Sequence, residues 1–312
     1  MKIGIVGTGG VATRHLGVLS TLPTCALVGH VSASAARAEA QAERWGGRAY
    51  TDVSEMLECE SPDAVWVCVT PDRHGSLEAA LIASGVPFFV EKPLSNDLAT
   101  AERIAAELDA TRLVVGVGYK FRALDILPRT RAMLGERPPQ LAIGAWHDAT
   151  PAPAWWRDEQ RSGGQLVEQA THLVDLARVL LGEPRVVAAT AWQQPRPRHP
   201  DWGIAPATAA LLVFGAGIPA TVTATCLLEG PLAIRLQLIC EGRQLTITEK
   251  YLRIETGRDP IEEIAVSVDP FLVEDEAFLE AVRDGNPHGV LCDYADALAT
   301  HRVAVAIRSA SG

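Results

Sequence analysis

The sequence predicts an α/β protein with two parts: a parallel sheet covered by helices, then an α/β part with a mostly antiparallel sheet. Three observations support this fold class. Short apolar runs alternate with helical patterns up to about residue 120, glycines follow the first apolar run directly, and short alternating strands follow one another after residue 184. Strands spaced by helices imply right-handed crossovers and a parallel sheet, whereas consecutive alternating strands pair antiparallel.

The first part contains apolar runs that are short enough to be buried strands. Strands are expected at 2–6, 25–32, 63–70, 87–92 and 112–119, with helices at 11–22, 34–45, 73–84 and 96–109 between them. Pro71 and Asp72 open the third of these helices and Gly85 closes it. We place the boundary near residue 120, which divides the chain into parts 1–120 and 121–312.

The second part begins with a loop and a long helix across 155–182. Strands are then expected at 185–193, 208–214, 219–228, 233–242, 243–250 and 251–256, followed by helices at about 270–284 and 293–309. The proline-rich stretch 193–206 is interpreted as a loop because strands resume directly after it. The last helix has the length to pack back on the first part.

Composition restricts the class of partner. The chain has 312 residues and a net charge of −10, and no block of basic residues indicates a nucleic-acid or anionic membrane surface. No apolar stretch is long enough to span a bilayer, and the N-terminal run is too short for a signal peptide. The six cysteines are scattered without a CxxC pair, which favours free thiols in a reducing cytoplasm.

The stretch "GTGGVA" fits the pattern G-x-G-x-x-A between the first strand and the first helix. A tight turn at Gly7, close approach of a pyrophosphate at Gly9 and close packing at Ala12 would place phosphates on the helix N-terminus. Glycines also serve ordinary turns, but this context favours a dinucleotide-binding Rossmann domain. The expected contacts are Gly7, Gly9, Gly10, Val11 and Ala12.

The end of the second strand carries no acid. Ser32 stands where Rossmann domains that select NAD place an Asp or Glu on the ribose, with Ser34 and Arg37 close behind. Small hydroxyls and an arginine would accept a 2′-phosphate, so we expect NADP, with NAD still usable. The alternative is that Ser32 only caps a helix and Arg37 is only solvated.

"VEKPL" ends a buried strand with two opposite charges and a proline. Ligands of an open parallel sheet lie beyond the carboxyl ends of its strands, so Lys92 should face the nicotinamide. A surface Glu–Lys pair is the alternative, and Pro93 argues against it because it sets the chain direction directly after the lysine.

Glu168, His172 and Asp175 have spacings of four and three, which places them on one stripe of a regular helix. Apolar residues form a second stripe on nearly the opposite face. Taken alone, the row is best explained as a hydrogen-bonded interior histidine. A metal site is a further alternative, although no second histidine has ligand spacing, and no metal is expected.

Together, "GIVGTGGVA", "VTPDRHGSLEAALIASGVPFFVEKPLS" and "SGGQLVEQATHLVDLARVLLGE" resemble the glucose–fructose oxidoreductase / inositol dehydrogenase (Gfo/Idh/MocA) family. The resemblance implies a Rossmann domain, here 1–120, and a substrate-binding and oligomerisation domain, here 121–312, with an open, largely antiparallel sheet. It further implies a homodimer or homotetramer. The activity it implies is NAD- or NADP-dependent interconversion of an alcohol and a ketone on a sugar, inositol or related polyol.

The resemblance also implies roles for single residues. The family's E-K-P motif falls on Glu91, Lys92 and Pro93, with the Lys92–Pro93 peptide typically cis, and its catalytic histidine falls on His172. Glu168 stands where an aspartate is common, Ala170 where a glycine is common, and Tyr119 to Arg122 depart from the family's Asn-Arg-Arg-type stretch. Expected cofactor contacts of the matched segment are Thr70, Pro71, His74, Glu91 and Lys92.

In the implied reaction His172 removes the hydroxyl proton, Lys92 binds that oxygen, and hydride leaves for the nicotinamide. Glu168 would orient His172 or bind a neighbouring hydroxyl. The sugar pocket is expected to include His147, Trp155, Trp156 and Arg157, although core packing explains the tryptophans equally well. The alternatives are a non-catalytic cofactor-binding regulator of the same fold and, more weakly, a zinc-dependent hydrolase.

Overall fold

The computed structural model describes residues 1–194, 202–215 and 217–311. The chain forms two compact units. Unit 1 comprises Met1–Ala123 and Asp269–Leu298, and unit 2 comprises Leu124–Val268 and Ala299–Gly312. Unit 1 therefore also includes residues 269–298, which lie far beyond the single boundary expected near residue 120.

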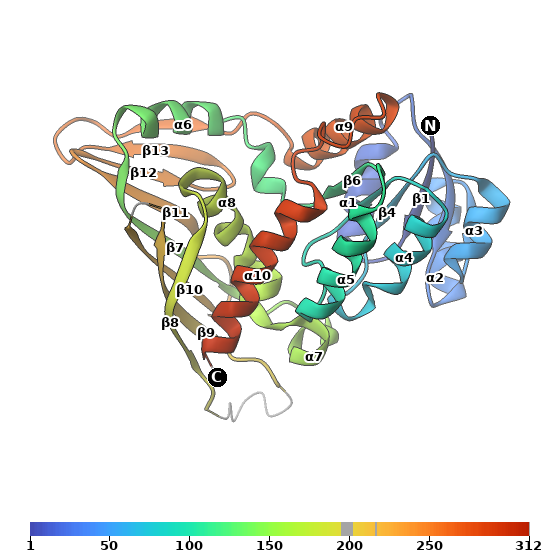
Figure 1. Cartoon of the computed structure of the whole chain (residues 1–312), viewed down its shortest axis with the longest axis horizontal. Helices are drawn as coiled ribbons and strands as arrows, with labels where there is room; N and C mark the ends of the chain where they lie inside the picture. Colours follow the sequence, from blue (N-terminus) through green and yellow to red (C-terminus); the bar gives the residue numbers. More distant parts are fainter. Residues whose placement is uncertain (195–201, 216, 312) are drawn as a thin grey trace. The chain divides into compact units, whose positions relative to one another are not determined.

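Unit 1 contains a six-stranded parallel sheet in the order β3-β2-β1-β4-β5-β6 (Figure 1). This is the strand order of a doubly wound Rossmann domain, as the sequence predicts. The strands are β1 (Lys2–Val6), β2 (Ala26–Val31), β3 (Arg48–Tyr50), β4 (Ala64–Val67), β5 (Phe88–Val90) and β6 (Val115–Val117).

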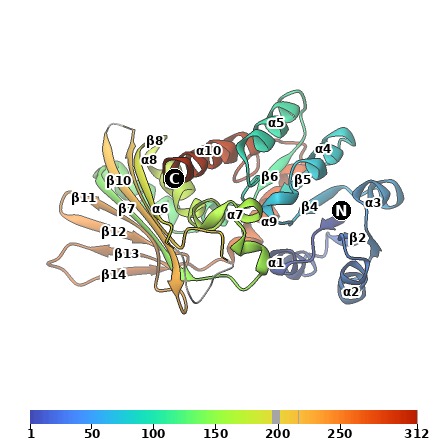
Figure 2. The same cartoon turned by 90° about the horizontal axis from the view of Figure 1, so that it is seen from below.

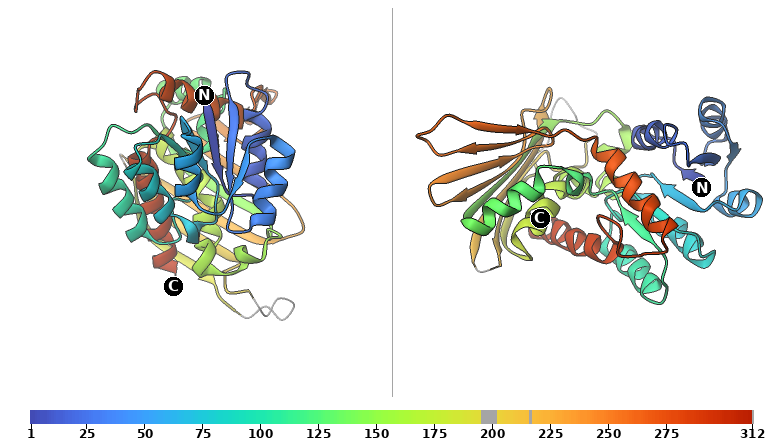
Figure 3. Two further views of the ribbon diagram at one scale, coloured as in Figure 1. Left: turned by 90° about the vertical axis from the view of Figure 1, so that its right-hand side faces the viewer. Right: turned by 90° about the horizontal axis from the view of Figure 1, so that it is seen from above.

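Helices cover both faces of this sheet (Figure 3, left). Successive strand residues point to opposite faces, so Trp66 and Phe89 belong to one core while Val65 and Val90 belong to the other. The helices are α1 (Gly10–Leu19), α2 (Ala35–Trp45), α3 (Val53–Glu60), α4 (Ser76–Ala83), α5 (Leu98–Asp109), α9 (Pro270–Arg283) and the start of α10 (Tyr294–Ser311), with 3-10 turns η1 (Pro71–Arg73) and η2 (Lys120–Ala123).

Unit 2 contains an eight-stranded sheet in the order β14-β13-β12-β11-β7-β10-β9-β8. Among the strand pairs of the described residues, β7 and β10 alone are parallel, so the sheet is mostly antiparallel, as predicted. Helix α8 lies on one face of this sheet (Figure 2). The strands are β7 (Pro139–Ala149), β8 (Pro184–Trp192), β9 (Ala207–Phe214), β10 (Ile218–Leu228), β11 (Ala233–Cys240), β12 (Arg243–Ile247), β13 (Tyr251–Glu255) and β14 (Glu262–Ala265).

The central strand β7 was not among the predicted strands. Its sequence "PQLAIGAWHDA" contains glycine and alanines, which have low strand propensity. The pairing accounts for the glycine, since a Cβ on Gly144 would lie 3.3 Å from Val222 Cγ2 of β10. Close packing across this pair therefore favours small residues in β7.

The loop and the long helix predicted across 155–182 are present in that order, with short helical turns within the loop. The segment forms η3 (Ala154–Arg157), α7 (Glu159–Ser162), a π-helical turn η4 (Leu166–Ala170) and then α8 (Thr171–Leu181). The wider π turn breaks the regular spacing of the predicted polar stripe, and such turns often occur at functional sites. Residues 171–178 of α8 are all buried, so the helix does not present one polar face to solvent.

The remaining predictions are met more closely. The two last helices are α9 and α10, while α6 (Leu127–Glu136) was not predicted. All six cysteines are free thiols. No helix of the described chain has the length and hydrophobicity of a membrane span. The predicted loop at 193–206 falls partly on residues 195–201, which lie outside the described residues.

Candidate active site

The loop between β1 and α1 has the geometry of a phosphate cradle. Gly7 has φ +115°, and a Cβ there would lie 2.0 Å from the Cys68 carbonyl oxygen, so only glycine fits. A Cβ on Gly9 or Gly10 would meet nothing within 4 Å, which leaves the backbone at the helix start accessible. Ala12 is fully buried against the sheet. These residues fit the pyrophosphate of a dinucleotide.

The adjacent end of β2 carries hydroxyl groups and no acid. Ser32 Oγ lies 3.4 Å from Thr8 Oγ1 and accepts a hydrogen bond from the Ser34 backbone N–H at 3.3 Å. The first turn of α2 contains no acidic residue, and Arg37 in that turn is exposed. A 2′-phosphate would meet no carboxylate from this turn.

A buried hydrogen-bond chain supports the cradle from below. Gln41 Nε2 lies 3.1 Å from both the Gly7 carbonyl oxygen and His30 Nδ1, and His30 Nε2 donates to the Gly46 carbonyl at 2.7 Å. Burial lowers the pKa of His30, so the ring stays neutral and Nδ1 accepts from Gln41. Sequence reasoning missed both residues, which look like ordinary strand and helix positions.

Lys92 follows β5 at the carboxyl edge of the sheet. Its peptide bond to Pro93 is cis, which confirms the feature implied by the family resemblance. Lys92 is half-buried, while Glu91, Pro93 and Leu94 around it are buried. The lysine is therefore the partly accessible member of an otherwise enclosed turn.

Behind this turn Glu91 belongs to a buried ionic chain. His15 Nε2 lies 3.1 Å from Glu91 Oε1, and His15 Nδ1 lies 2.8 Å from Asp275 Oδ1. Trp66 Nε1 donates to the same Asp275 oxygen at 2.9 Å. The Glu91 carboxylate, predicted to contact the cofactor, thus contacts His15, and Gly118 leaves room for it, because a Cβ there would lie 2.5 Å from Glu91 Oε1.

The buried ionic chain keeps the His15 imidazole protonated. Burial alone lowers its pKa, but the Asp275 charge and hydrogen bonds to Asp275 and Glu91 outweigh burial and raise the pKa to about 10. Burial raises the pKa of the nearby Asp275 and Glu274 carboxyls. His15, Glu91 and Glu274 place ligand atoms within 4.8 Å of one another, as the ligands of a metal ion would be. Both ring nitrogens of His15 already contact carboxylates, however, so the positive charge at this position is that of the protonated imidazole.

The segment after β4 presents Thr70, Pro71 and His74. Thr70 Oγ1 donates to Asp72, and His74 Nδ1 lies 2.5 Å from Glu78 Oε1. Burial tends to raise the pKa of Glu78, but the pairing with His74 and backbone N–H groups lowers it overall. His74 Nε2 is buried and has no hydrogen-bond partner among the described residues.

In unit 2, the π turn and α8 separate the members of the predicted polar row. Glu168 Oε2 accepts a hydrogen bond from Trp156 Nε1 at 2.7 Å, and Trp156 is 1% exposed. The His172 ring stacks on Trp146 with centroids 5.9 Å apart and is 5% exposed. Asp175 is fully buried and accepts from Thr300 Oγ1 at 2.7 Å, so it ties α8 to α10.

The other expected pocket residues have defined partners. His147 Nε2 lies 2.9 Å from Thr223 Oγ1, and burial together with the Arg235 charge lowers the His147 pKa. The Arg157 guanidinium lies 5.3 Å from the centre of the Trp202 ring. Trp155 packs against the small core formed by Trp156, Ile204 and Cys226.

The fold and the loop after β1 define a class: a nicotinamide-dependent oxidoreductase with a Rossmann domain. Two family models support it, "Oxidoreductase family, NAD-binding Rossmann fold" over residues 1–119 and "GFO/IDH/MocA C-terminal domain" over residues 139–246. The chain belongs to the Gfo/Idh/MocA family and is an NAD(P)-dependent dehydrogenase or reductase.

Three proteins show what the chain is similar to. The chain is 27% identical to a 4-carboxy-2-hydroxymuconate-6-semialdehyde dehydrogenase of Sphingobium sp., over 91% of each chain. It is 31% identical to an inositol 2-dehydrogenase of Cereibacter sphaeroides, over 70% of this chain and 65% of that one. A 3-ketoreductase from Actinomadura kijaniata, solved with NADP and TDP-benzene, shares the fold with a TM-score of 0.87, 21% identity and coverage of 100% and 98%.

Proposed function

We propose that the protein interconverts an alcohol and a ketone on a sugar, inositol or related polyol, with a preference for NADP. The observation that carries the proposal is the position of Lys92, which follows the carboxyl end of β5 directly after Glu91 of the buried ionic chain. Ligands of such sheets lie beyond this edge. An inositol 2-dehydrogenase among the similar proteins supports the substrate class.

Lys92 and His172 have different roles at the hydroxyl group that is oxidised. The nicotinamide cofactor, held by the β1–α1 loop, would accept hydride from the alcohol carbon. His172 takes the hydroxyl proton, because a neutral imidazole is the usual base near neutral pH. Lys92 donates a hydrogen bond to the same oxygen and stabilises the negative charge that develops there.

Glu168 is proposed to bind a hydroxyl next to the reacting carbon. One carboxylate oxygen already accepts from Trp156 Nε1, which holds the group in a single orientation. A carboxylate has two oxygens and accepts several hydrogen bonds, so Glu168 has the capacity to accept one from a sugar hydroxyl as well.

The test is a turnover assay with a panel of sugars and polyols and either cofactor. Lys92→Met and His172→Asn should each lower kcat by at least about a hundredfold, the smaller end of what a positioned acid–base group contributes. Lys250→Met and His288→Asn repeat the same changes at exposed positions and should keep wild-type rates. No turnover of any alcohol by the wild type would refute the proposal and favour a non-catalytic regulator.

A second candidate substrate is an aldehyde in its hydrated or cyclic hemiacetal form. The observation in its favour is the match to the semialdehyde dehydrogenase over 91% of both chains. A hydrated aldehyde is an alcohol at the reacting carbon, so the same two residues would serve it. Faster turnover of semialdehydes than of polyols would decide for this candidate.

We also propose a cytoplasmic homodimer or homotetramer assembled through the sheet of unit 2. Large apolar side chains on its strands are exposed, among them Trp192 at 45%, Leu211 at 40% and Leu227 at 50%. A second copy of the chain packed on this sheet would cover such side chains. Light scattering during gel filtration should give a multiple of the chain mass of 33.3 kDa, and Leu211→Glu should lower it.

A further inference from the structure

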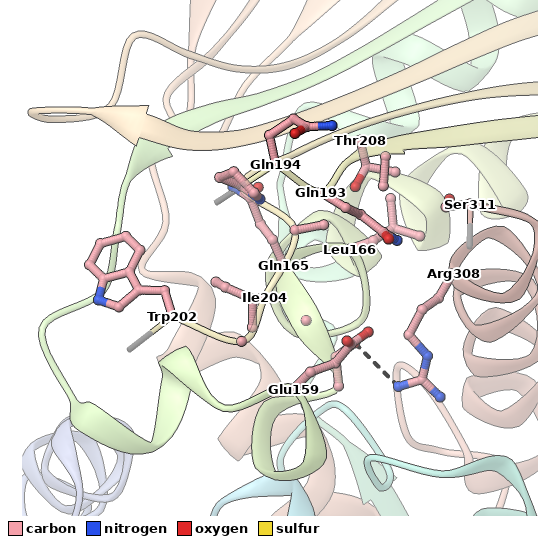
Figure 4. A pocket seen from close by; sticks show the side chains of 16 residues that line it. Glu159, Gln165, Leu166, Gln193, Gln194, Trp202, Ile204, Thr208, Arg308 and Ser311 are labelled. Carbon is pink, nitrogen blue, oxygen red and sulfur yellow. Dashed lines mark hydrogen bonds between the residues drawn. The ribbon is translucent and has the colours of Figure 1, made fainter. Parts of the chain in front are cut away.

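Unit 2 contains a cavity that holds none of the proposed catalytic residues. Its volume is about 500 Å³, within the range of small-molecule sites. Figure 4 shows Trp202 on one side, Arg308 and Ser311 on the opposite side, and side-chain amides between them. The described lining residues are Glu159, Gly163, Gly164, Gln165, Leu166, Ala191, Gln193, Gln194, Trp202, Gly203, Ile204, Ala205, Pro206, Thr208, Arg308 and Ser311.

Gln165 is the most informative residue of the lining. The residue is 2% exposed, and its Nε2 donates to Gln169 Oε1 at 3.2 Å. Gln165 Oε1 has no hydrogen-bond partner among the described residues. Because a buried acceptor without a donor is costly, a ligand that brings a donor into the cavity would be favoured here.

The charges of the lining favour a neutral ligand. Glu159 and Arg308 carry opposite charges, and Arg308 also donates to the Gly163 carbonyl at 3.3 Å. An anion would meet Glu159 and a cation would meet Arg308. The other polar side chains are amides and hydroxyls, which pair best with groups that both donate and accept, as sugar hydroxyls do.

The cavity adjoins the residue proposed to bind the substrate. Gln165 and Leu166 lie at the start of the π turn that carries Glu168. On the other side, Ile204 packs with Trp156, whose indole donates to Glu168. The cavity and the Glu168 carboxylate are thus built from the same turn and the same small core.

We propose that this cavity is a subsite for the non-reacting ring of a disaccharide or glycoside, whose other ring is oxidised. This proposal rests on the proposed function for the identity of the reaction. It makes the natural substrate a sugar carrying a second saccharide unit, rather than a free monosaccharide or inositol.

The test measures binding by calorimetry without cofactor, so that it does not depend on turnover. Glucose, maltose, cellobiose, trehalose and inorganic phosphate are the probes, and full-length protein is used. At least one disaccharide should bind about tenfold or more tightly than glucose. Gln165→Met, which keeps the side-chain volume, should weaken the binding of that disaccharide by about three- to tenfold, as expected for one lost hydrogen bond. The affinity for glucose should not change.

Further variants keep the result interpretable if Gln165→Met fails to fold. Thr208→Val and Arg308→Gln alter the lining elsewhere, while Arg302→Gln makes the same charge change on α10 at an exposed position outside the cavity. Weaker disaccharide binding by Thr208→Val and Arg308→Gln, together with unchanged binding by Arg302→Gln, supports the subsite. Equal affinity for glucose and all disaccharides, no effect of the lining variants, or competition by phosphate would overturn it.

The subsite and the reaction can fail separately. Disaccharide binding that depends on Gln165 in a protein without any turnover would support the subsite and refute the proposed reaction. Turnover of monosaccharides with lining variants that behave as wild type towards disaccharides would refute the subsite and leave the reaction standing.

Discussion

His15 is expected to make the stability of the protein fall as the pH rises. The ring is fully buried, and its two nitrogens face Asp275 and Glu91, with Glu274 close by. Its pKa changes from 6.5 in the unfolded chain to about 10 in the fold. Since one pKa unit corresponds to 1.36 kcal/mol, this difference of roughly 3.5 is on the order of 5 kcal/mol.

The sign follows from the direction of the pKa difference. The folded state holds the proton more tightly, so the contribution is complete below about pH 6.5 and is lost as the pH rises to about 10. The raised pKa values of Asp275 and Glu274 act in the same direction, each from its own unfolded value upwards. These three groups are sufficient to make the free energy of unfolding fall as the pH rises.

His15→Asn removes the cation and leaves the carboxylates. Breaking a buried ion pair from one side costs about 3–5 kcal/mol, so the variant should be less stable by that amount at pH 6. Between pH 7 and 10 it should lack the part of the slope that His15 contributes, while Asp275 and Glu274 keep theirs. Urea unfolding at pH 6, 8 and 10 measures both effects, with the exposed His288→Asn as the matched control. A wild-type slope no steeper than that of His15→Asn, or an NMR titration of His15 near pH 6.5, would refute the reasoning.

Three further predictions concern the proposed reaction. The rate of alcohol oxidation should fall as the pH is lowered between about 8 and 5, where a histidine base takes up a proton. His172→Asn should remove this pH dependence of the rate. A pH profile that the substitution leaves unchanged would exclude His172 as the base. Ser32→Asp should raise the Kd for NADP by about one to two decades by placing an acid at the 2′-phosphate, and equal or tighter NAD binding by the wild type would contradict the preference. Gly7→Ala should lower cofactor affinity at least tenfold, because the new Cβ would meet the Cys68 carbonyl at 2.0 Å. Titration of the cofactor measures this change, with Gly135→Ala in α6 as the control, because a Cβ there meets nothing within 4 Å and lies outside the cofactor-binding loop.

The fold of unit 1 was predictable because its signals are local. Each buried strand is a short apolar run, and the glycines after β1 sit directly where the turn needs them. Helix α3 and strand β3 were not predicted; β3 has three residues, which are too few for an alternating pattern to be recognised. In unit 2 the central strand β7 was missed because pairing with β10, which lies about 80 residues later, decides its identity.

The sequence alone determined the motif residues of the candidate site, Lys92 and His172, because motif order and spacing are sequence properties. The tertiary structure alone decided what surrounds them. His15 and Asp275 are 260 residues apart, and nothing local marks them as partners. The π turn at Glu168 and the hydrogen bond between Glu168 and Trp156 likewise depend on tertiary packing, which the periodicity of the sequence does not indicate. Burial changes the protonation of such groups, and burial arises only when distant segments come together.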